Sequence, residues 1–153
     1  YKYRRYVECR RYIMIINYRN IQSEDDWNWI SKRADPTLTE NTKGIVAVDT
    51  KVDRIVAMAV FDTWTHNSAH IHWAIDNPLI LRHGFIQECF NYVFNTCDKG
   101  IMLATIPSDN AKSLKLSSHI GLDVVHTIKD GFNKGVDYIL MEMRKENCKW
   151  LKG

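Results

Sequence analysis

The 153-residue chain lacks the patterns that mark a membrane span, a leader peptide or a cysteine framework. No stretch approaches the roughly 20 consecutive apolar residues that cross a bilayer, and the first residues lack the apolar core of a signal peptide. The four cysteines are widely scattered and include no C-x-x-C pair, so neither a disulfide framework nor a zinc ribbon is indicated. They are Cys9, Cys89, Cys97 and Cys148. We therefore expect a cytoplasmic protein whose cysteines are free thiols.

The sequence offers few candidate metal ligands. His70 and His72 lie two residues apart on one face of a predicted strand and could hold a metal ion, but no further ligand with a suitable spacing is evident. We therefore expect no metal.

About 150 residues are enough for one domain with a sheet and several helices, and no repeat or low-complexity linker divides the chain.

Positive charge is concentrated at the N-terminus. Residues 1–13 carry five cationic side chains against one glutamate, a net charge of +4 in a chain of net charge +3, so the remainder carries −1. Four tyrosines alternate with these cations, and such a mixture can stack on bases and contact phosphates. We treat residues 1–13 as an extension that either contacts nucleic acid or merely precedes a domain of residues 14–153.

The middle of the chain predicts two parallel strands connected through a helix. Residues 68–75 alternate polar and apolar side chains, which is typical of a strand, and Asp76-Asn77-Pro78 ends it. The apolar positions of residues 85–94 predict a helix with one buried face, and residues 101–106 predict the second strand. A further helix is expected from Asn110 to Gly121. Strands connected through a helix are expected to be parallel.

The flanking segments predict antiparallel strands and one more helix. Ser23, followed by acidic residues and Asp26, fits a helix start with a capping box. The remaining elements are a strand at 14–20, a loop or short helix at 35–42, and hairpins at 44–49 with 54–62 and at 124–129 with 136–143. The turn of the second hairpin is expected over residues 130–135.

A turn containing Arg82, His83 and Gly84 precedes the central helix. Free N–H groups at a helix start bind phosphate anions, a glycine allows the backbone to approach closely, and an arginine adds a cation. The same residues are also common in ordinary turns, so the local pattern leaves both interpretations open.

The order of these elements, and the spacing of Asn110, Ser113 and Gly121-Leu122, resemble the GNAT superfamily of N-acetyltransferases over roughly residues 14–151. The ending, residues 137–151, is similar to that of short phage and prophage members. The resemblance implies an α/β fold of the α+β type, with a single mixed, mostly antiparallel sheet of six to seven strands flanked by about four helices. It also implies an acetyl-CoA-dependent N-acetyltransferase in the cytoplasm of a bacterial or phage-infected cell, with a small-molecule or protein amine as acceptor.

The resemblance also assigns the site. The residues expected to bind acetyl-CoA are Trp73, Ala74, Ile75, Arg82, His83, Gly84, Phe85, Asn110 and Ser113. The family often uses a glutamate on its fourth strand as the base that deprotonates the amine. Here that strand offers His70 and His72 instead, and an imidazole is suited to this task. Ser117 stands where many members have a tyrosine that protonates the departing thiolate.

Two departures from the family pattern bear on activity. The turn has one glycine where the family usually has two, and Ser117 replaces the tyrosine. These departures and the phage-like ending favour, as an alternative, a catalytically inactive GNAT-fold phage structural or regulatory protein. A further alternative is a nucleic-acid-modifying GNAT-like enzyme guided by the basic extension. The acceptor is not readable from the sequence, and a homodimer through the C-terminal strands is common in the family.

Overall fold

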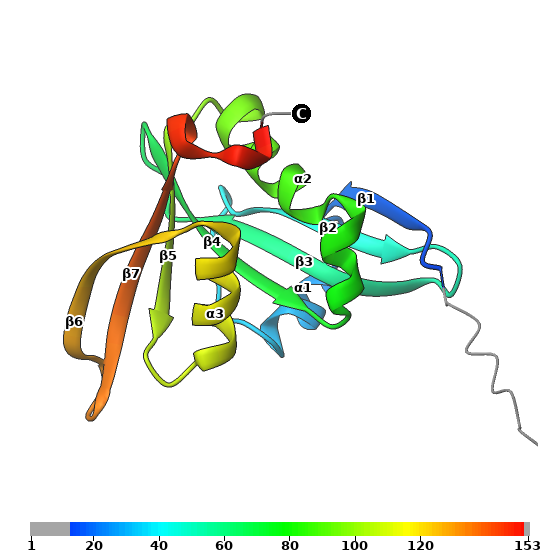
Figure 1. Cartoon of the computed structure of the whole chain (residues 1–153). Helices are drawn as coiled ribbons and strands as arrows, with labels where there is room; N and C mark the ends of the chain where they lie inside the picture. The colour runs from blue at the N-terminus through cyan, green and yellow to red at the C-terminus, as the bar shows by residue number, and fades with distance from the viewer. Residues whose placement is uncertain (1–12, 152–153) are drawn as a thin grey trace, which may run out of the picture.

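The computed structural model describes residues 13–151, so the basic extension lies outside the described residues except for Ile13. One seven-stranded sheet in the order β1-β2-β3-β4-β5-β7-β6 forms its centre (Figure 1). Its strands are β1 Ile16–Asn20, β2 Lys43–Asp49, β3 Arg54–Asp62, β4 Ser68–Ile75, β5 Ile101–Pro107, β6 Asp123–Asn133 and β7 Val136–Arg144. All neighbouring strands are antiparallel except β4 and β5. The expected single mixed, mostly antiparallel sheet is confirmed, as is its parallel central pair.

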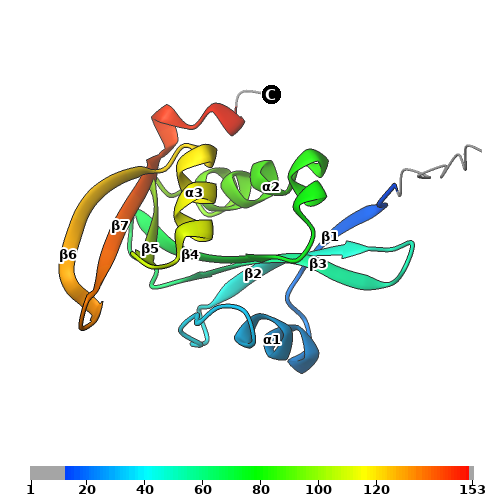
Figure 2. The ribbon, with the colours of Figure 1, turned by 60° about the horizontal axis from the view of Figure 1, so that its bottom comes forward.

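Helices cover both faces of this sheet (Figure 2). α1 lies on one face, and α2 and α3 lie on the other. The helical segments are α1 Glu24–Ser31, the 3-10 helix η1 Pro78–His83, α2 Phe85–Asn91, the π-helical turn η2 Tyr92–Thr96, α3 Ala111–Ile120, and the 3-10 turns η3 Lys145–Asn147 and η4 Lys149–Leu151. Within residues 13–151, no helix is long and apolar enough to cross a membrane.

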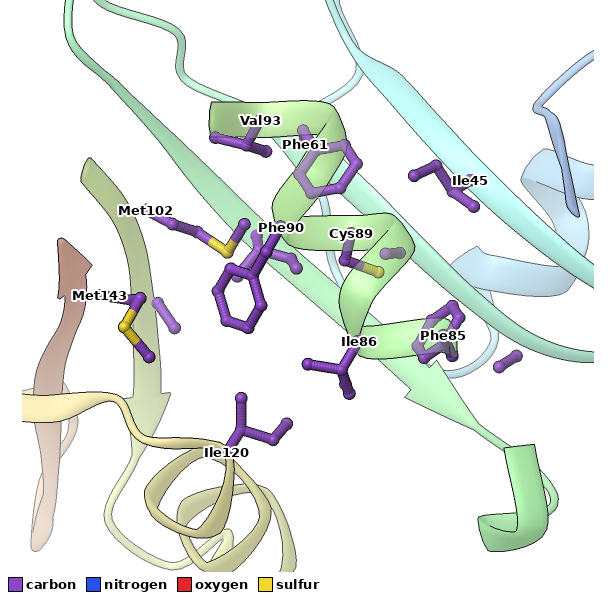
Figure 3. Packing of buried hydrophobic residues seen from close by; sticks show 14 of the residues in the cluster. Ile45, Phe61, Phe85, Ile86, Cys89, Phe90, Val93, Met102, Ile120 and Met143 are labelled. Carbon is purple, nitrogen blue, oxygen red and sulfur yellow. The ribbon is translucent and has the colours of Figure 1, made fainter. Parts of the chain in front are cut away.

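The larger core lies between the sheet and α2. Phe85 and Phe90 are fully buried on α2, and Phe61 and Met102 meet them from the strands (Figure 3). Phe94, in the following turn η2, is fully buried as well. The rings of Phe90 and Phe94 stack with their centroids 5.7 Å apart. Burying each such side chain stabilises the fold by roughly 1.5–3 kcal/mol, so α2 is held firmly against β3 to β5.

A smaller core holds α1 against the opposite face. Ile30 packs against Val46, Met58 and Val60, all fully buried. Because β2 and β3 are covered on both faces, their sequences are almost continuously apolar rather than alternating. β4 is thus fixed along the edge that pairs with β3. Its opposite edge, toward β5, is where the candidate active site lies.

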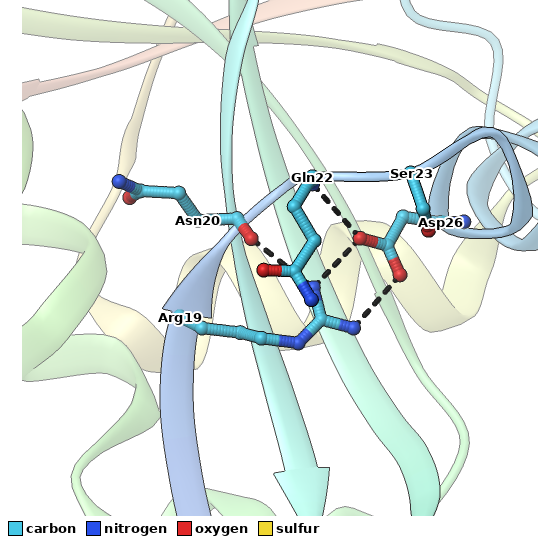
Figure 4. A network of polar contacts seen from close by, with 5 residues as sticks. All are labelled: Arg19, Asn20, Gln22, Ser23 and Asp26. Carbon is cyan, nitrogen blue, oxygen red and sulfur yellow. Dashed lines mark hydrogen bonds and ion pairs between the residues drawn. The ribbon is translucent and has the colours of Figure 1, made fainter.

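The start of α1 is fixed by a buried ion pair (Figure 4). Ser23 caps the helix as expected, since its hydroxyl accepts a hydrogen bond from the Asp26 N–H at 3.3 Å. The Asp26 carboxylate does not serve the expected capping box but accepts bonds from Arg19 Nη1 and Nη2, at 2.6 and 2.9 Å, and from the Gln22 N–H at 3.0 Å. Hydrogen bonding from Arg19 lowers the pKa of Asp26.

The prediction of a six-residue turn at 130–135 is wrong. β6 continues to Asn133, which pairs with Val136, so the connection is Lys134-Gly135 alone. A register shift after Ile128 absorbs the extra residues into the strand as a bulge. Asp130 stabilises this bulge because its carboxylate accepts a hydrogen bond from the Gly135 N–H at 2.8 Å.

Three of the four cysteines fall in the described region, and they are free thiols as expected. Cys89 and Cys148 are buried and Cys97 is partly exposed, whereas Cys9 lies outside the described residues.

Candidate active site

The two parallel strands separate after a short paired stretch (Figure 1). β4 and β5 pair only through Ser68, Ala69 and His70, opposite Ile101, Met102 and Leu103. On its other side β4 remains paired with β3 as far as Ile75. Residues 71–75 therefore turn an unpaired backbone edge toward β5, and an extended chain can bind along such an edge as an added strand.

Two cavities occupy this opening. The first, of about 120 Å³, lies between the strands and is lined from β4 by Ile71, His72 and Trp73 and from β5 by residues 104–107. The second, of about 310 Å³, continues along β4 through Trp73, Ala74 and Ile75 toward α3, where Lys112 and Leu116 line it. Arg33, Trp73, Asn110 and Ser113 line both cavities. The structure thus brings together five residues that the sequence assigned to acetyl-CoA binding: Trp73, Ala74, Ile75, Asn110 and Ser113.

Asn110 caps a helix in addition to lining both cavities. Its side-chain oxygen accepts a hydrogen bond from the Ser113 N–H at 3.2 Å and so caps α3. The cap fixes the first turn of α3 against the opening, which places Ser113 there too.

Residues 82–85 lie beyond the end of β4 and are not among the residues that line these two cavities. The turn is more ordered than expected, because residues 78–83 form the 3-10 helix η1 with Ile80 fully buried. Gly84 then adopts a φ of +83°, and α2 begins directly after it. A Cβ added at Gly84 would find its nearest contact at 3.9 Å, so the position needs glycine for its backbone conformation rather than for space.

His72 is held by a carboxylate that the sequence analysis did not select. Its Nε2 lies 2.9 Å from Oδ2 of Asp62, the last residue of β3. The Asp62 side chain is 2% exposed, whereas that of His72 is 28% exposed and lines the smaller cavity. A signal existed in the sequence, because antiparallel pairing of 54–62 with 68–75 brings the end of one strand beside the start of the other.

His70 lies on the same face of β4 but in a different environment. It is directly opposite Asp62 in the sheet register, and its Nδ1 is buried without a hydrogen-bond partner among the described residues. Burial lowers the pKa of His70, an effect that the nearby Asp62 carboxylate opposes and His72 reinforces. A lowered pKa favours a neutral ring.

Ser117 lies on α3 and is fully buried. Its hydroxyl has no hydrogen-bond partner among the described residues, and it is not among the residues that line the two cavities. Its assignment as a substitute for the family's tyrosine stays a prediction.

Arg33, which follows α1, was also missed by the sequence analysis. Its guanidinium donates through Nε and Nη2 to both carboxylate oxygens of Asp76, each at 2.9 Å, and lies 3.8 Å from the centroid of the Trp29 ring. Arg33 and Asp76 are 43 residues apart, so only the folded sheet brings them together.

The part of the chain that the structure describes contains no group of three or more metal-binding side chains placed to share a metal ion. The opening offers an imidazole and carboxylate pair beside an open strand edge.

Comparisons with known proteins agree on the fold. No protein-family model matches the sequence, and no curated protein is significantly similar to it. The spermidine N-acetyltransferase of Vibrio cholerae, solved in complex with CoA and spermine, superposes with a TM-score of 0.70 at 12% identity, covering 86% of this chain and 96% of that one. The ribosomal-protein-S5-alanine acetyltransferase of Vibrio fischeri gives 0.67 at 16% identity, covering 88% and 94%. The chain therefore has the GNAT acetyltransferase fold.

Proposed function

We propose that the chain is an acetyl-CoA-dependent N-acetyltransferase that transfers the acetyl group to an amine by direct attack on the thioester. The observation that carries the proposal is the His72 and Asp62 pair at the opening between β4 and β5. A fold shared with N-acetyltransferases supports the reaction class, but a fold alone does not determine function, so the argument rests on the site.

The open edge of β4 suits the pantetheine arm of acetyl-CoA. Backbone groups of residues 73–75 would pair with its amides as a neighbouring strand does. Asn110 and Ser113 face the same space from α3, and Lys112 adds a cation to the larger cavity. We assign the turn Arg82, His83, Gly84 and Phe85 to the pyrophosphate, because it lies at the start of α2, after β4 and η1.

The reaction requires a base. An alkyl ammonium with an ordinary pKa near 10.4 loses its proton at a cost of about 4.6 kcal/mol at pH 7. His72 accepts this proton, the amine nitrogen then bonds to the thioester carbonyl carbon, and the carbon–sulfur bond breaks with its electron pair leaving on sulfur. The nitrogen gives up a second proton, which the sulfur takes, and His72 returns its proton to solvent. The products are the N-acetylated amine, CoA thiol and one proton.

The acceptor is a small-molecule or protein amine. The Vibrio cholerae neighbour was solved with spermine, which supports an amine acceptor without identifying it. The solved neighbours are acetyltransferases and add no support for the inactive phage protein, the nucleic-acid enzyme or the homodimer. The similarity to phage members likewise stays a prediction.

The test is calorimetric titration with acetyl-CoA of the wild type and of two tryptophan variants on α3. Ser113 lines both cavities, so Ser113→Trp should fill them and abolish binding. Ser118 is exposed on the same helix, so Ser118→Trp should bind as the wild type does. A wild type that does not bind acetyl-CoA contradicts the proposal, and so does undiminished binding by Ser113→Trp.

A further inference from the structure

Polar groups contact the buried Asp62 carboxylate from three directions. Oδ2 accepts from the Thr37 N–H at 2.7 Å and lies 2.9 Å from His72 Nε2, and Oδ1 accepts from the Thr63 hydroxyl at 3.2 Å. A carboxylate that is 2% exposed requires such donors, because an unpaired buried charge is strongly unfavourable. These contacts come from the segment after α1, from β4 and from the residue that follows β3, so the carboxylate joins three parts of the molecule.

The backbone beside Asp62 is strained in a way that serves this arrangement. Thr63 has a φ of +49°, which is rare and unfavourable for a β-branched residue. In this conformation its hydroxyl reaches Asp62. Residues in such conformations cluster at functional sites, where the surrounding structure maintains them.

The segment that contributes the Thr37 N–H is ordered by its own threonines. The Thr42 hydroxyl donates to the Thr37 carbonyl at 2.7 Å and accepts from the Thr39 N–H at 2.9 Å. Thr42 is buried, so this loop has a fixed shape rather than an open one. Its contact with Asp62 therefore places the loop at a defined position beside His72.

We propose that Asp62 is a positioning residue for the acetyl transfer: it holds His72 through Nε2, leaves Nδ1 to take the proton from the acceptor amine, and anchors residues 37–42 through the same carboxylate oxygen. The proposal rests on the proposed function, with His72 as the base. Because a carboxylate only accepts hydrogen bonds, Nε2 must carry a proton to bond to Asp62, and the lone pair of the neutral ring is then on Nδ1.

The proton balance follows from this tautomer. When Nδ1 takes a proton from the acceptor, the ring becomes an imidazolium, and the Asp62 carboxylate stabilises its positive charge while remaining ionised. The ring then loses the Nδ1 proton to solvent and returns to its starting state. Nε2 keeps its proton throughout.

His70 does not fit this role equally well. It faces Asp62 across the sheet register, but Asp62 Oδ2 already lies 2.9 Å from His72 Nε2, and His70 Nδ1 is buried. Only His72 combines a fixed nitrogen with a place in the lining of the smaller cavity. The structure therefore favours His72 over His70 as the base, a choice that the sequence left open.

The first test is a proton NMR measurement on protein labelled with ¹⁵N, without acetyl-CoA. We expect a downfield resonance for the His72 Nε2 proton, protected from solvent exchange, that disappears in Asp62→Ala. Asp26 is the matched control, because it is also a buried, ion-paired aspartate but lies on α1 beside Arg19. Asp26→Ala should leave the His72 resonance unchanged. A His72 ring that is protonated at Nδ1 in the wild type, or a resonance that survives in Asp62→Ala, overturns the proposal.

The second test is kinetic and uses Asp62→Asn, which keeps the size of the side chain and an oxygen for Nε2 but removes the charge. We expect kcat to fall by on the order of 10²-fold, within the range that general bases contribute, while KM for acetyl-CoA stays unchanged. An unchanged kcat in Asp62→Asn overturns the proposal. If the wild type transfers no acetyl group at all, the proposed function fails instead, and the NMR result still decides whether Asp62 fixes the ring.

Discussion

Arg33 and Asp76 form a bidentate ion pair between the end of α1 and the end of β4, with both nitrogen–oxygen distances at 2.9 Å. The two side chains are 30% and 44% exposed, so water screens their attraction and we expect the pair to contribute under about 1 kcal/mol to stability. The position of this pair matters more than its energy, because Arg33 forms part of both linings and Asp76 part of the larger one.

Arg33→Ala should therefore alter binding more than stability. We expect an unfolding free energy within about 1 kcal/mol of the wild type and a weaker affinity for acetyl-CoA, measured by denaturant unfolding and calorimetry. Arg144→Ala is the control, because Arg144 pairs with Glu142 on β7 and lies outside these cavities. Unchanged affinity together with a large loss of stability would reverse this interpretation.

Gly84→Ala tests the turn after β4. Alanine at a φ of +83° should cost about 1 kcal/mol, without a steric clash. If the turn contacts the pyrophosphate, acetyl-CoA binding should weaken while binding of acetyl-pantetheine, which lacks the pyrophosphate, stays the same. Gly135→Ala is a matched control, because Gly135 has a φ of +77° in the remote hairpin. Equal effects on both ligands, or on neither, would place the pyrophosphate elsewhere.

The Asp26 ion pair predicts a pH dependence of stability. The pKa of Asp26 is lower in the folded state than in the unfolded chain, so its contribution is fully present above the unfolded value of about 3.9 and is lost as the pH falls through the folded value. Asp26→Asn should lower the unfolding free energy by about 2 kcal/mol at pH 7, and the difference from the wild type should shrink below about pH 4. Asp25→Asn, on the exposed side of α1, should show neither effect. If the difference in unfolding free energy between the wild type and Asp26→Asn stayed constant across the acidic range, the charge of Asp26 would not contribute to stability.

Ser117→Ala tests the buried hydroxyl. Removing a polar group that has no partner among the described residues should stabilise the protein by up to about 1 kcal/mol, seen as a rise in Tm. A loss of stability would mean that the hydroxyl has a partner after all. The kcat of the same variant tests the predicted role in thiolate departure.

Much of the framework could be predicted from local sequence. Residues 68–75 form a strand because polar and apolar side chains alternate there, and Asn110 starts a helix because its side chain caps the first turn. The parallel pairing of β4 and β5 follows from the helix between them. These features depend on residues close together in the chain.

The features that define the site depend on residues far apart. Asp62 reaches His72 only through the register of β3 and β4, and Arg33 meets Asp76 only after α1 has packed on the sheet. The bulge after Ile128 was missed for the same reason, since the pairing with β7, rather than a local turn signal, determines where β6 ends.

The most direct test of the account is amine-dependent release of CoA thiol from acetyl-CoA, measured over a panel of small amines and peptides. We predict release by the wild type with at least one acceptor, a fall of about 10²-fold or more in His72→Ala, and no change in His66→Ala, an exposed histidine in the loop before β4. Equal rates in the wild type and His72→Ala would contradict the account.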